Sequence, residues 1–402
     1  MSSFRMIAQT QFGLEEVLRV ELLKLGARDI QRHNRAVSFH GDLGFLYKAN
    51  LCLRTAIRVL VPIADFRVRS ADELYRGIHR IDWETFLTPD ETFAVRCTLN
   101  SPHLDHSQFA MQRTKDAIVD RFRERFGNRP SVDTEDPVLR IQVHVIGDHG
   151  QVSLDSSGTS LHERGYRDET GPAPINEVLA AGMVQLSGWD PRRPLVDPMC
   201  GSGTIAIEAG LLACNIPPGL FRKGFGFQRW NDYDADLYGT IHDSLLKRIS
   251  EEQPVIVAGE RSAEIVEMAR TNVANAQLDD AIEVRHSAFE DLEPPPGKGV
   301  LIINPPYGER MDHQGAEAEA EVEAINAFYK MIGDTLKKRW SGWQAWVITS
   351  NMEAAKHIKL TPKPRIQLFN GSLDCRFMKY DLYEGSRRLT PDQLHRISYL
   401  WR

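Results

Sequence analysis

Two short polar segments, each directly after an apolar run, constrain the fold of this chain more than any other feature. Asn304-Pro305-Pro306-Tyr307 follows Val300-Leu301-Ile302-Ile303, a run that is typical of a buried strand. The segment 197–204, with the sequence DPMCGSGT, follows Leu195-Val196 and precedes an apolar helix over 205–212. Ligands of open α/β sheets bind at the carboxyl ends of the strands. The two segments therefore predict an α/β sheet whose strand ends form one ligand site.

The glycine-rich segment predicts a loop that holds a nucleotide-like cofactor. Gly201 and Gly203 permit positive φ angles and a close approach of the backbone to a ligand. Asp197 ends the strand, where its carboxylate can accept hydrogen bonds from the ammonium or hydroxyl groups of a ligand. Dinucleotide-binding turns share Gly-x-Gly, but their third glycine is replaced here by Ala206. The alternative is a strand–helix turn without a ligand, which gives the carboxylate no purpose.

A second acid follows the next predicted strand. The apolar run 254–259 leads to Glu260, and helical spacing follows over 263–276. An acid in this place binds ribose hydroxyls in many α/β sites. The alternative is an exposed glutamate that the helix dipole favours. The segment 217–238, rich in proline, glycine and aromatic residues, is predicted to be an insertion between the two strands.

The Asn-Pro-Pro-Tyr segment predicts hydrogen-bond acceptors for a planar amine. An exocyclic amine of a base is a poor nucleophile, because its lone pair is delocalised into the ring. Hydrogen bonds to the side-chain oxygen of Asn304 and the carbonyl of Pro305 would expose that lone pair to a methyl donor. The prolines stiffen the turn, and Tyr307 is expected to stack on a base rotated out of its helix or loop. A rigid loop without a substrate is the alternative.

The two segments together resemble those of amino-methyltransferases that depend on S-adenosylmethionine and methylate adenine, guanine or cytosine. Further segments are similar to the large-subunit ribosomal RNA N2-guanine methyltransferases and their THUMP domain: LDHSQ at 104–108, LHERGYR at 161–167, IAIEA at 205–209, Gly308-Glu309-Arg310 and NGSLDC at 370–375. The resemblance implies S-adenosylmethionine as cofactor. It also implies the site residues, which are Asn304, Pro305 and Tyr307 for catalysis and Asp197, Cys200, Gly201, Gly203, Thr204, Glu260 and Asn304 for the cofactor.

The chain departs from that family's pattern at two places. Ser262 stands where the family usually has a second acid after the second strand. His286-Ser287-Ala288 stands where an acid often contacts the adenine amine, and Glu290 and Asp291 lie only nearby. The residue that contacts adenine therefore stays open.

The resemblance implies an α+β N-terminal region, ferredoxin-like and THUMP, followed by an α/β Rossmann-like class I methyltransferase domain. The expected boundaries are 1–68 for the ferredoxin-like domain, 69–160 for THUMP, 161–174 for a linker and 175–402 for the catalytic domain. Apolar periodicity in the N-terminal region predicts helices over 13–25, 43–50, 73–78 and 107–126 and strands over 37–39, 56–63, 92–98, 138–146 and 151–155.

Composition is that of a soluble protein of several domains. With 402 residues, 42% of them hydrophobic, the chain can form two or three cores of about 100–200 residues each. Apolar runs stay short of the roughly 20 residues that cross a membrane, and the N-terminus lacks an apolar signal core. Five cysteines without a paired short spacing imply neither a metal site nor a disulfide framework. The expected location is the reducing cytoplasm.

The net charge does not indicate RNA binding, whereas local clusters of basic residues are compatible with it. The net charge of −6 argues against a generic nucleic-acid binder, although local basic faces decide phosphate contacts. Five basic residues of the helix 107–126 alternate with acids, so phosphate contact and a salt-bridged solvated face both remain open: Arg113, Lys115, Arg121, Arg123 and Arg125 beside Asp116, Asp120 and Glu124.

The predicted function is methyl transfer to the N2 amine of guanine in RNA, with large-subunit (23S) ribosomal RNA as the favoured substrate. Transfer to guanine N2 of tRNA or to adenine N6 uses the same acceptors and is an alternative. A non-enzymatic RNA-binding assembly factor is another alternative, and the intact cofactor and Asn-Pro-Pro-Tyr segments argue against it.

Overall fold

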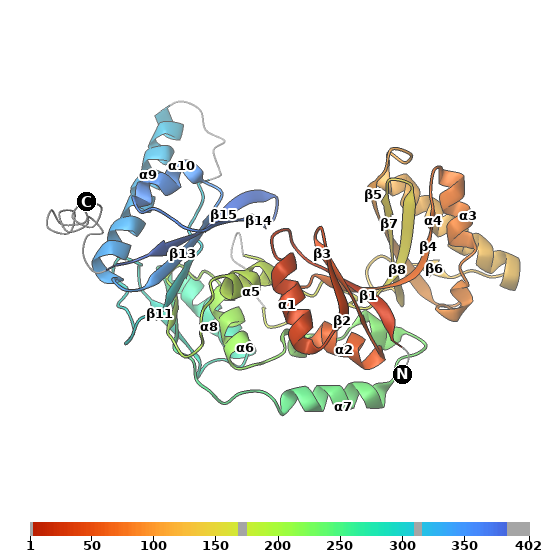
Figure 1. The fold of residues 1–402 in the computed structure, drawn as a ribbon, viewed down its shortest axis with the longest axis horizontal. Coiled ribbons are helices and arrows are strands. Elements are labelled where there is room, and N and C mark those ends of the chain that lie inside the picture. The colour runs from red at the N-terminus through yellow and green to blue at the C-terminus, as the bar shows by residue number, and fades with distance from the viewer. Residues whose placement is uncertain (1–2, 168–174, 309–315, 384–402) are drawn as a thin grey trace, which may run out of the picture. The chain divides into compact units, whose positions relative to one another are not determined.

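The computed structural model describes residues 3–167, 175–308 and 316–383, and the chain divides into two compact units (Figure 1). The N-terminal unit consists of Met1–Tyr166 and Asn215–Ser250, and the catalytic unit consists of Arg167–Cys214 and Glu251–Arg402. Parts of three expected features lie outside the described residues: 168–174 of the linker, Glu309-Arg310 of the motif after Tyr307, and 384–402 of the catalytic domain.

One eight-stranded sheet runs through the N-terminal unit, in the order β2-β3-β1-β4-β8-β7-β5-β6. Strand β4 pairs antiparallel with both β1 and β8, so the sheet continues across the boundary expected at residue 68. Its elements are β1 (Phe4–Gln9), α1 (Glu15–Leu25), β2 (Arg28–His33), β3 (Ala36–Gly41), α2 (Leu43–Cys52), β4 (Arg58–Arg67), α3 (Ala71–His79), β5 (Thr92–Asn100), α4 (Ser107–Phe126), β6 (Ser131–Val132), β7 (Leu139–Ile146) and β8 (His149–Asp155).

The four helices predicted for this unit are present, and the bounds of α4 match those predicted. Strands β1 and β2 were not predicted. Strand β2 has the sequence RDIQRH and is almost wholly exposed at the sheet edge. It therefore lacks the alternation of apolar and polar residues by which a half-buried strand is recognised.

Residues 215–250 belong to the N-terminal unit, whereas sequence analysis placed them in the catalytic domain. Aromatic packing explains this assignment. The ring of Tyr47 stacks on that of Phe227 with centroids 4.5 Å apart, and Phe225 stacks on Phe227 at 5.3 Å. The Tyr47 hydroxyl also accepts a hydrogen bond from the Asp234 backbone amide at 2.9 Å, directly before helix α7 (Ala235–Leu246). The inserted segment thus completes a core that the preceding 166 residues leave open.

The start of the predicted linker is also packed in this unit. Leu161, Arg164 and Tyr166 are buried. The Arg222 guanidinium, from the inserted segment, donates hydrogen bonds to the carbonyl oxygens of Ser160 at 2.8 Å and Glu163 at 2.6 Å. It also bonds to Ser157 and to the backbone and side chain of Thr159. One side chain thus fixes the loop that leaves the THUMP region.

The catalytic unit has a seven-stranded sheet in the order β11-β10-β9-β12-β13-β15-β14. The first five strands are parallel, and β15 and β14 continue the sheet antiparallel. Its elements are α5 (Glu177–Leu186), β9 (Leu195–Asp197), α6 (Thr204–Ala213), β10 (Ile256–Glu260), α8 (Ala263–Asn275), β11 (Ile282–His286), β12 (Val300–Ile303), α9 (Ala316–Arg339), β13 (Gln344–Thr349), α10 (Met352–Ala355), β14 (Arg365–Asn370) and β15 (Leu373–Asp381).

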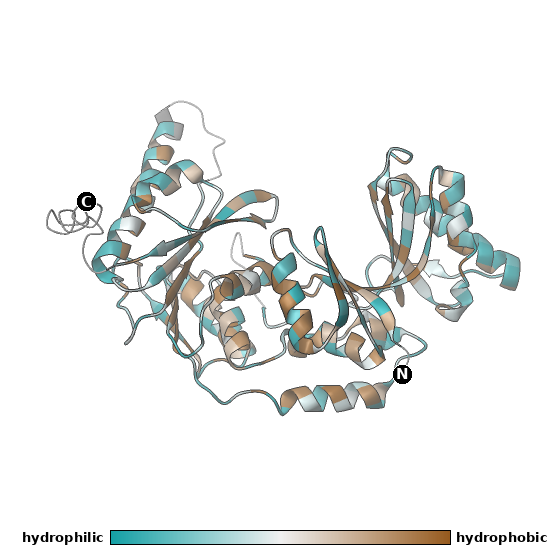
Figure 2. Cartoon of the chain, in the orientation of Figure 1, coloured by the Kyte–Doolittle hydropathy of each residue, from teal (hydrophilic) through white to brown (hydrophobic). Residues whose placement is uncertain are grey.

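The order in which the chain adds strands to the sheet reverses at β9, and this reversal determines where the site lies. From β9 the chain proceeds to β10 and β11 on one side, and then returns to β12 on the other side. Such a switch point leaves a crevice at the carboxyl ends of the two central strands. The central strands are apolar (Figure 2), and all four residues of β12 are buried. The segments that follow β9 and β12 are the two from which the site was predicted.

We expect Arg222→Ala to destabilise the N-terminal unit, because it leaves several backbone carbonyls of the loop at 157–163 without their donor. Hydrogen bonds to charged groups contribute about 1.5–3 kcal/mol, so the free energy of unfolding should fall by roughly 2–4 kcal/mol in all. Urea denaturation measures the loss, and hydrogen exchange of the loop amides locates it. Lys223→Ala, at an exposed neighbour, is the control. Unchanged exchange in the Arg222 variant would contradict the assigned role.

Candidate functional site at the strand ends

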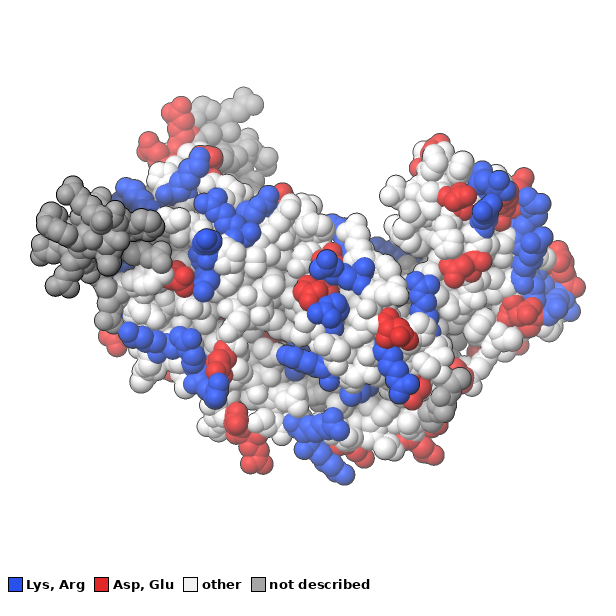
Figure 3. Space-filling model, in the orientation of Figure 1, with Lys and Arg blue, Asp and Glu red and all other residues white. Residues whose placement is uncertain are grey.

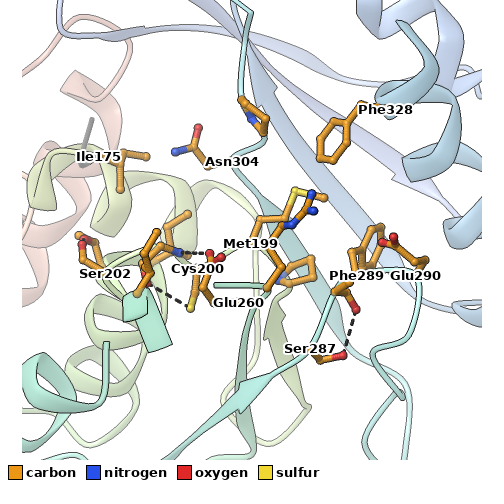
Figure 4. Close-up of a pocket in the computed structure, with 18 of the residues that line it drawn as sticks. Ile175, Met199, Cys200, Ser202, Glu260, Ser287, Phe289, Glu290, Asn304 and Phe328 are labelled. Carbon is orange, nitrogen blue, oxygen red and sulfur yellow. Dashed lines mark hydrogen bonds between the residues drawn. The ribbon is translucent and has the colours of Figure 1, made fainter. Parts of the chain in front are cut away.

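A cavity of about 340 Å³ lies at the carboxyl ends of β9, β10, β11 and β12 (Figure 4). Five of the predicted site residues line it, namely Cys200, Gly201, Thr204, Glu260 and Asn304. Asp197, Gly203, Pro305 and Tyr307 do not line it, although each is adjacent in sequence to a segment that does. The remaining lining residues are Ile175, Pro198, Met199, Ser202, Ile205, Arg261, Ile265, Ser287, Ala288, Phe289, Glu290, Pro306, Phe328 and Met331.

The glycine-rich loop after β9 is held in shape by backbone hydrogen bonds. The Cys200 amide donates to the Gly259 carbonyl, and the Gly203 amide donates to the Cys200 carbonyl, both at 2.9 Å. Gly201 and Gly203 have φ angles of 52° and 86°, which favour glycine. A Cβ at Gly203 would come within 3.6 Å of Ala269, whereas one at Gly201 would meet nothing within 4 Å. Backbone conformation therefore favours glycine at both positions, and Gly201 also lines the cavity.

Glu260 joins the loops that follow β9 and β10. One carboxylate oxygen accepts from the Gly201 amide at 3.2 Å, and the other accepts from the Ser262 amide at 2.9 Å. The Ser262 hydroxyl accepts from the Ile265 amide at 3.5 Å, so Ser262 is the N-cap of α8. Serine is a preferred residue there, which gives a structural reason for the departure at this position. Each oxygen of Glu260 keeps a lone pair that can accept from a ligand hydroxyl.

Asp197 is a fully buried acid at the end of β9. Neither carboxyl oxygen has a partner of good hydrogen-bond geometry among the described residues. Burial raises the pKa of Asp197 to about 8, the charge of Glu260 adds to this, and the nearby Met199 amide opposes it. An unpaired buried carboxylate is costly. Asp197 is closed off from the cavity, whereas Gly201 and Glu260 line it, so the oxygens of Glu260 fit the ribose hydroxyls of S-adenosylmethionine.

The loop after β11 supplies Phe289 and Glu290 to the cavity, whereas Asp291 does not line it. Sequence analysis left the adenine contact open among the acids here, and Glu290 is the acid that faces the cavity (Figure 4). Phe328 and Met331 of α9 were missed altogether. They are three residues apart, so they share one face of the helix. The spacing of these two apolar residues can be seen in the sequence, but it does not show which loop this face of α9 covers.

The Asn-Pro-Pro-Tyr turn is fixed by side chains that are distant in sequence. The Tyr329 hydroxyl donates to the Pro306 carbonyl at 3.3 Å, and the Asn351 amide donates to the Tyr307 carbonyl at 2.9 Å. The Tyr307 hydroxyl donates to the Asn304 side-chain oxygen at 2.7 Å. Tyr307 is half-buried, and burial raises the pKa of its hydroxyl. The residue predicted to stack on a base is therefore also bonded to the acceptor predicted to hold the amine.

Arg167 connects the start of the catalytic unit to the cofactor loop. Its guanidinium donates to the Thr204 hydroxyl at 2.6 Å and forms an ion pair with Glu177 at 3.3 Å. Thr204 is buried and begins α6. The last residue of the sequence segment 161–167 thus supports the loop on which the cofactor residues lie.

Within 3–167, 175–308 and 316–383, no three or more His, Cys, Asp or Glu side chains are grouped so that they could hold a metal ion. The helices of those same ranges include none that combines the length and apolar character needed to cross a membrane.

Three protein families match successive parts of the chain. The family described as "RMKL-like, methyltransferase domain" matches residues 164–379. The THUMP domain matches 68–155, and the "RlmL ferredoxin-like domain" matches 5–60. Together they follow the order of domains that the sequence predicts.

Similar proteins agree with these families. A Synechocystis protein named "Putative RNA methyltransferase" is 42% identical over 375 residues, which cover 92% of this chain and 95% of that protein. The "Ribosomal RNA large subunit methyltransferase K/L" of Syntrophotalea carbinolica is 39% identical over 383 residues, covering 92% of this chain. The chain spans about half the length of that relative, 53%. A crystal structure described as a "putative methyltransferase complexed with SAH" has a TM-score of 0.83 and 30% identity, covering 96% of this chain and all of the other.

We expect Asp197→Asn to stabilise the ligand-free protein and to abolish most cofactor binding. The pKa of Asp197 is raised from 3.8 to about 8, so the fold favours its neutral form. Wild-type stability should therefore fall as the pH rises from about 4 to 8, by at most about 1.4 kcal/mol per pH unit from this group. The stability of Asp197→Asn should lack this dependence on pH. Thermal unfolding against pH and calorimetry with S-adenosylmethionine measure the two effects.

Asp291→Asn provides the matched control, because Asp291 is exposed and does not line the cavity. It should alter neither the pH dependence nor the affinity. Unchanged cofactor affinity in Asp197→Asn would show that this acid has no part in the cofactor site.

Proposed function

We propose that this chain, which belongs to the RMKL-like methyltransferase family, methylates the exocyclic N2 amine of a guanine in RNA, and that the RNA is large-subunit ribosomal RNA. The observation that carries the proposal is the position of Asn304. Asn304 lines the cavity formed by the glycine-rich loop and Glu260, so a residue with an acceptor for an amine lies beside the predicted cofactor site. The matched ribosomal RNA methyltransferases supply the choice of substrate.

S-adenosylmethionine is the cofactor, and it supplies an electrophilic methyl group. Asp197 and the loop at 200–204 would hold its charged and polar groups, and the oxygens of Glu260 would accept from its ribose hydroxyls. The apolar side chains of Phe289, Phe328 and Met331 line the other part of the cavity, where they would exclude water and pack on the adenine ring. Glu290 can accept from the adenine amine.

The residues of the turn would hold and activate the substrate amine. The Asn304 oxygen and the Pro305 carbonyl are acceptors that favour an amine whose lone pair points out of the base plane. Their contribution grows as positive charge develops on nitrogen, which is the requirement for stabilising a transition state. The methylated amine becomes acidic and loses its proton afterwards, so no strong base is needed. Stacking of the base on the ring of Tyr307 remains part of the proposal.

The N-terminal unit would bind the RNA, although α4 is not an open phosphate-binding face. Arg121 and Arg125 pair with Glu84, Arg123 pairs with Asp120, and Arg113 pairs with Asp72. These contacts favour the salt-bridged alternative for that helix. Figure 3 shows basic and acidic side chains interspersed over this end of the unit. Phosphate contacts would therefore have to displace these ion pairs. Because phosphate contacts release counterions from the RNA, binding should weaken as the salt concentration rises.

Substrate choice between ribosomal RNA and tRNA rests on the relatives alone. Ribosomal RNA as substrate fits the cytoplasmic location predicted from the sequence. All five cysteines are free, as that reducing compartment would require. Adenine N6 could meet the same acceptors, because the turn recognises an amine rather than a ring.

We expect Asn304→Ala to reduce the rate of methylation by about a hundredfold or more, since one preorganised polar contact in a reaction site is worth that much. Cofactor affinity should change only a few-fold. Asn304→Asp keeps an acceptor oxygen on a side chain of the same length, so it should retain more activity than Asn304→Ala. Transfer of labelled methyl groups to RNA measures the rate, and calorimetry measures cofactor binding. A wild-type rate in Asn304→Ala would remove this residue from the mechanism.

Product analysis tests the substrate. RNA methylated by the wild-type protein, digested to nucleosides and examined by mass spectrometry, should contain N2-methylguanosine. The probes are large-subunit ribosomal RNA and tRNA, each transcribed without modifications. N6-methyladenosine would overturn the choice of base, and methylation of tRNA alone would overturn the choice of RNA. Cofactor binding without any methylated product would favour the assembly-factor alternative.

A further inference from the structure

The turn between β14 and β15 contains Asn370, in the segment 370–375 that the proposed function leaves without a role. Asn370 ends β14, and Gly371, with a φ angle of 64°, follows it in the turn. The Asn370 side-chain amide donates to the Tyr307 hydroxyl oxygen at 3.3 Å. The same hydroxyl donates to the Asn304 side-chain oxygen at 2.7 Å. A chain of two hydrogen bonds therefore connects this turn to the acceptor of the amine.

The two hydrogen bonds run in one direction, from Asn370 through Tyr307 to Asn304. A phenol has one hydrogen to donate and two lone pairs that accept. Asn370 supplies an N–H to the oxygen, and the phenol hydrogen is donated to the Asn304 side-chain oxygen. Burial raises the pKa of Tyr307, and the Cys375 side chain beside the hydroxyl raises it further, so the phenol hydrogen is retained throughout the neutral pH range.

The direction decides which end of the Asn304 carboxamide faces the tyrosine. An amide can rotate by half a turn and exchange its oxygen and its NH2 group. A donating phenol attracts the oxygen and disfavours the NH2 group. The carboxamide oxygen has a second lone pair, which stays available while the first accepts from Tyr307. In one orientation of Asn304 its oxygen bonds to Tyr307 and keeps an acceptor for an amine, and in the other the NH2 group takes that place, where a donor would repel an amine.

We propose that Tyr307 and Asn370 are positioning residues, which hold the Asn304 carboxamide with its oxygen toward the substrate amine. This inference rests on the proposed amine-methylating function. It gives the Tyr307 hydroxyl a role separate from any stacking by the ring. It also makes the turn between β14 and β15 part of the reaction site, although it is 63 residues from Tyr307 in sequence.

Asn370→Asp is the sharpest test, because it preserves size and reverses the hydrogen bond. A carboxylate at 370 accepts from the Tyr307 hydroxyl and withdraws its hydrogen from Asn304. We expect kcat for large-subunit ribosomal RNA to fall by about tenfold or more, the loss of one well-placed hydrogen bond, with the KM for RNA and the Kd for S-adenosylhomocysteine nearly unchanged. Asn370→Ala removes the donor without reversing it, so its loss should be smaller. Equal or higher kcat in Asn370→Asp would overturn the proposal.

Tyr307→Phe removes the hydroxyl and keeps the ring. Its kcat should fall as in Asn370→Asp, and the double variant should be no worse than Tyr307→Phe, because both changes break one chain. A raised kcat/KM in Tyr307→Phe would instead mean that the hydroxyl competes with the amine, and would overturn the proposal. Gln367→Ala is the control in the same hairpin, since Gln367 bonds to Asp374 and not to Tyr307.

Nuclear magnetic resonance tests the orientation without any turnover. The side-chain NH2 signals of Asn304 are identified by their loss in Asn304→Asp. They should shift in Tyr307→Phe and in Asn370→Asp, and remain in place in Gln367→Ala. Unshifted signals would overturn the proposal even in an active enzyme. If the wild-type protein methylates another base or no RNA, the proposed function fails while this comparison still decides the role of Asn370.

Discussion

The position of β9 between β10 and β12 is the constraint on which the rest of the catalytic unit depends. Parallel pairing on both sides places the ends of three strands at one edge of the sheet. The glycine-rich loop, Glu260 and Asn304 then meet around one cavity, although they come from separate parts of the sequence. The polar groups that follow β9, β10 and β12 are placed by this pairing first and by their own hydrogen bonds second.

The polar side chains of the site differ in whether they have hydrogen-bond partners within the protein. Glu260 and Thr204 have partners within the fold, so they define the shape of the cavity with or without a ligand. Asp197 is buried without a well-formed partner, which makes it a source of instability in the ligand-free fold. The satisfied groups keep the loops around the cavity in place.

Site residues that follow a recognisable strand could be predicted from the sequence, whereas residues placed by packing between distant segments could not. Asp197, Gly201, Glu260 and Asn304 each follow an apolar run, so the strand ends could be found from the sequence. The face of α9 that carries Phe328 and Met331 could not, because the helix's rotation depends on side chains across the sheet. The bond from Asn370 to Tyr307 joins residues of two different loops, which no periodicity reveals. Residues 215–250 pack with the N-terminal unit although they lie within the segment that matches the methyltransferase family, because their aromatic residues identify a core without saying which one.

The division of the N-terminal unit by 167–214 has a consequence for synthesis on the ribosome. The chain emerges from its N-terminus, and the rings of Phe225 and Phe227 arrive long after that of Tyr47. The first core stays unfinished until about residue 250 has emerged. By then α5, β9 and α6, which are almost wholly buried in the finished protein, are already outside the ribosome, whereas β10 and β12 have not yet emerged. The nascent chain therefore carries two incomplete apolar surfaces at once during this stage of its synthesis.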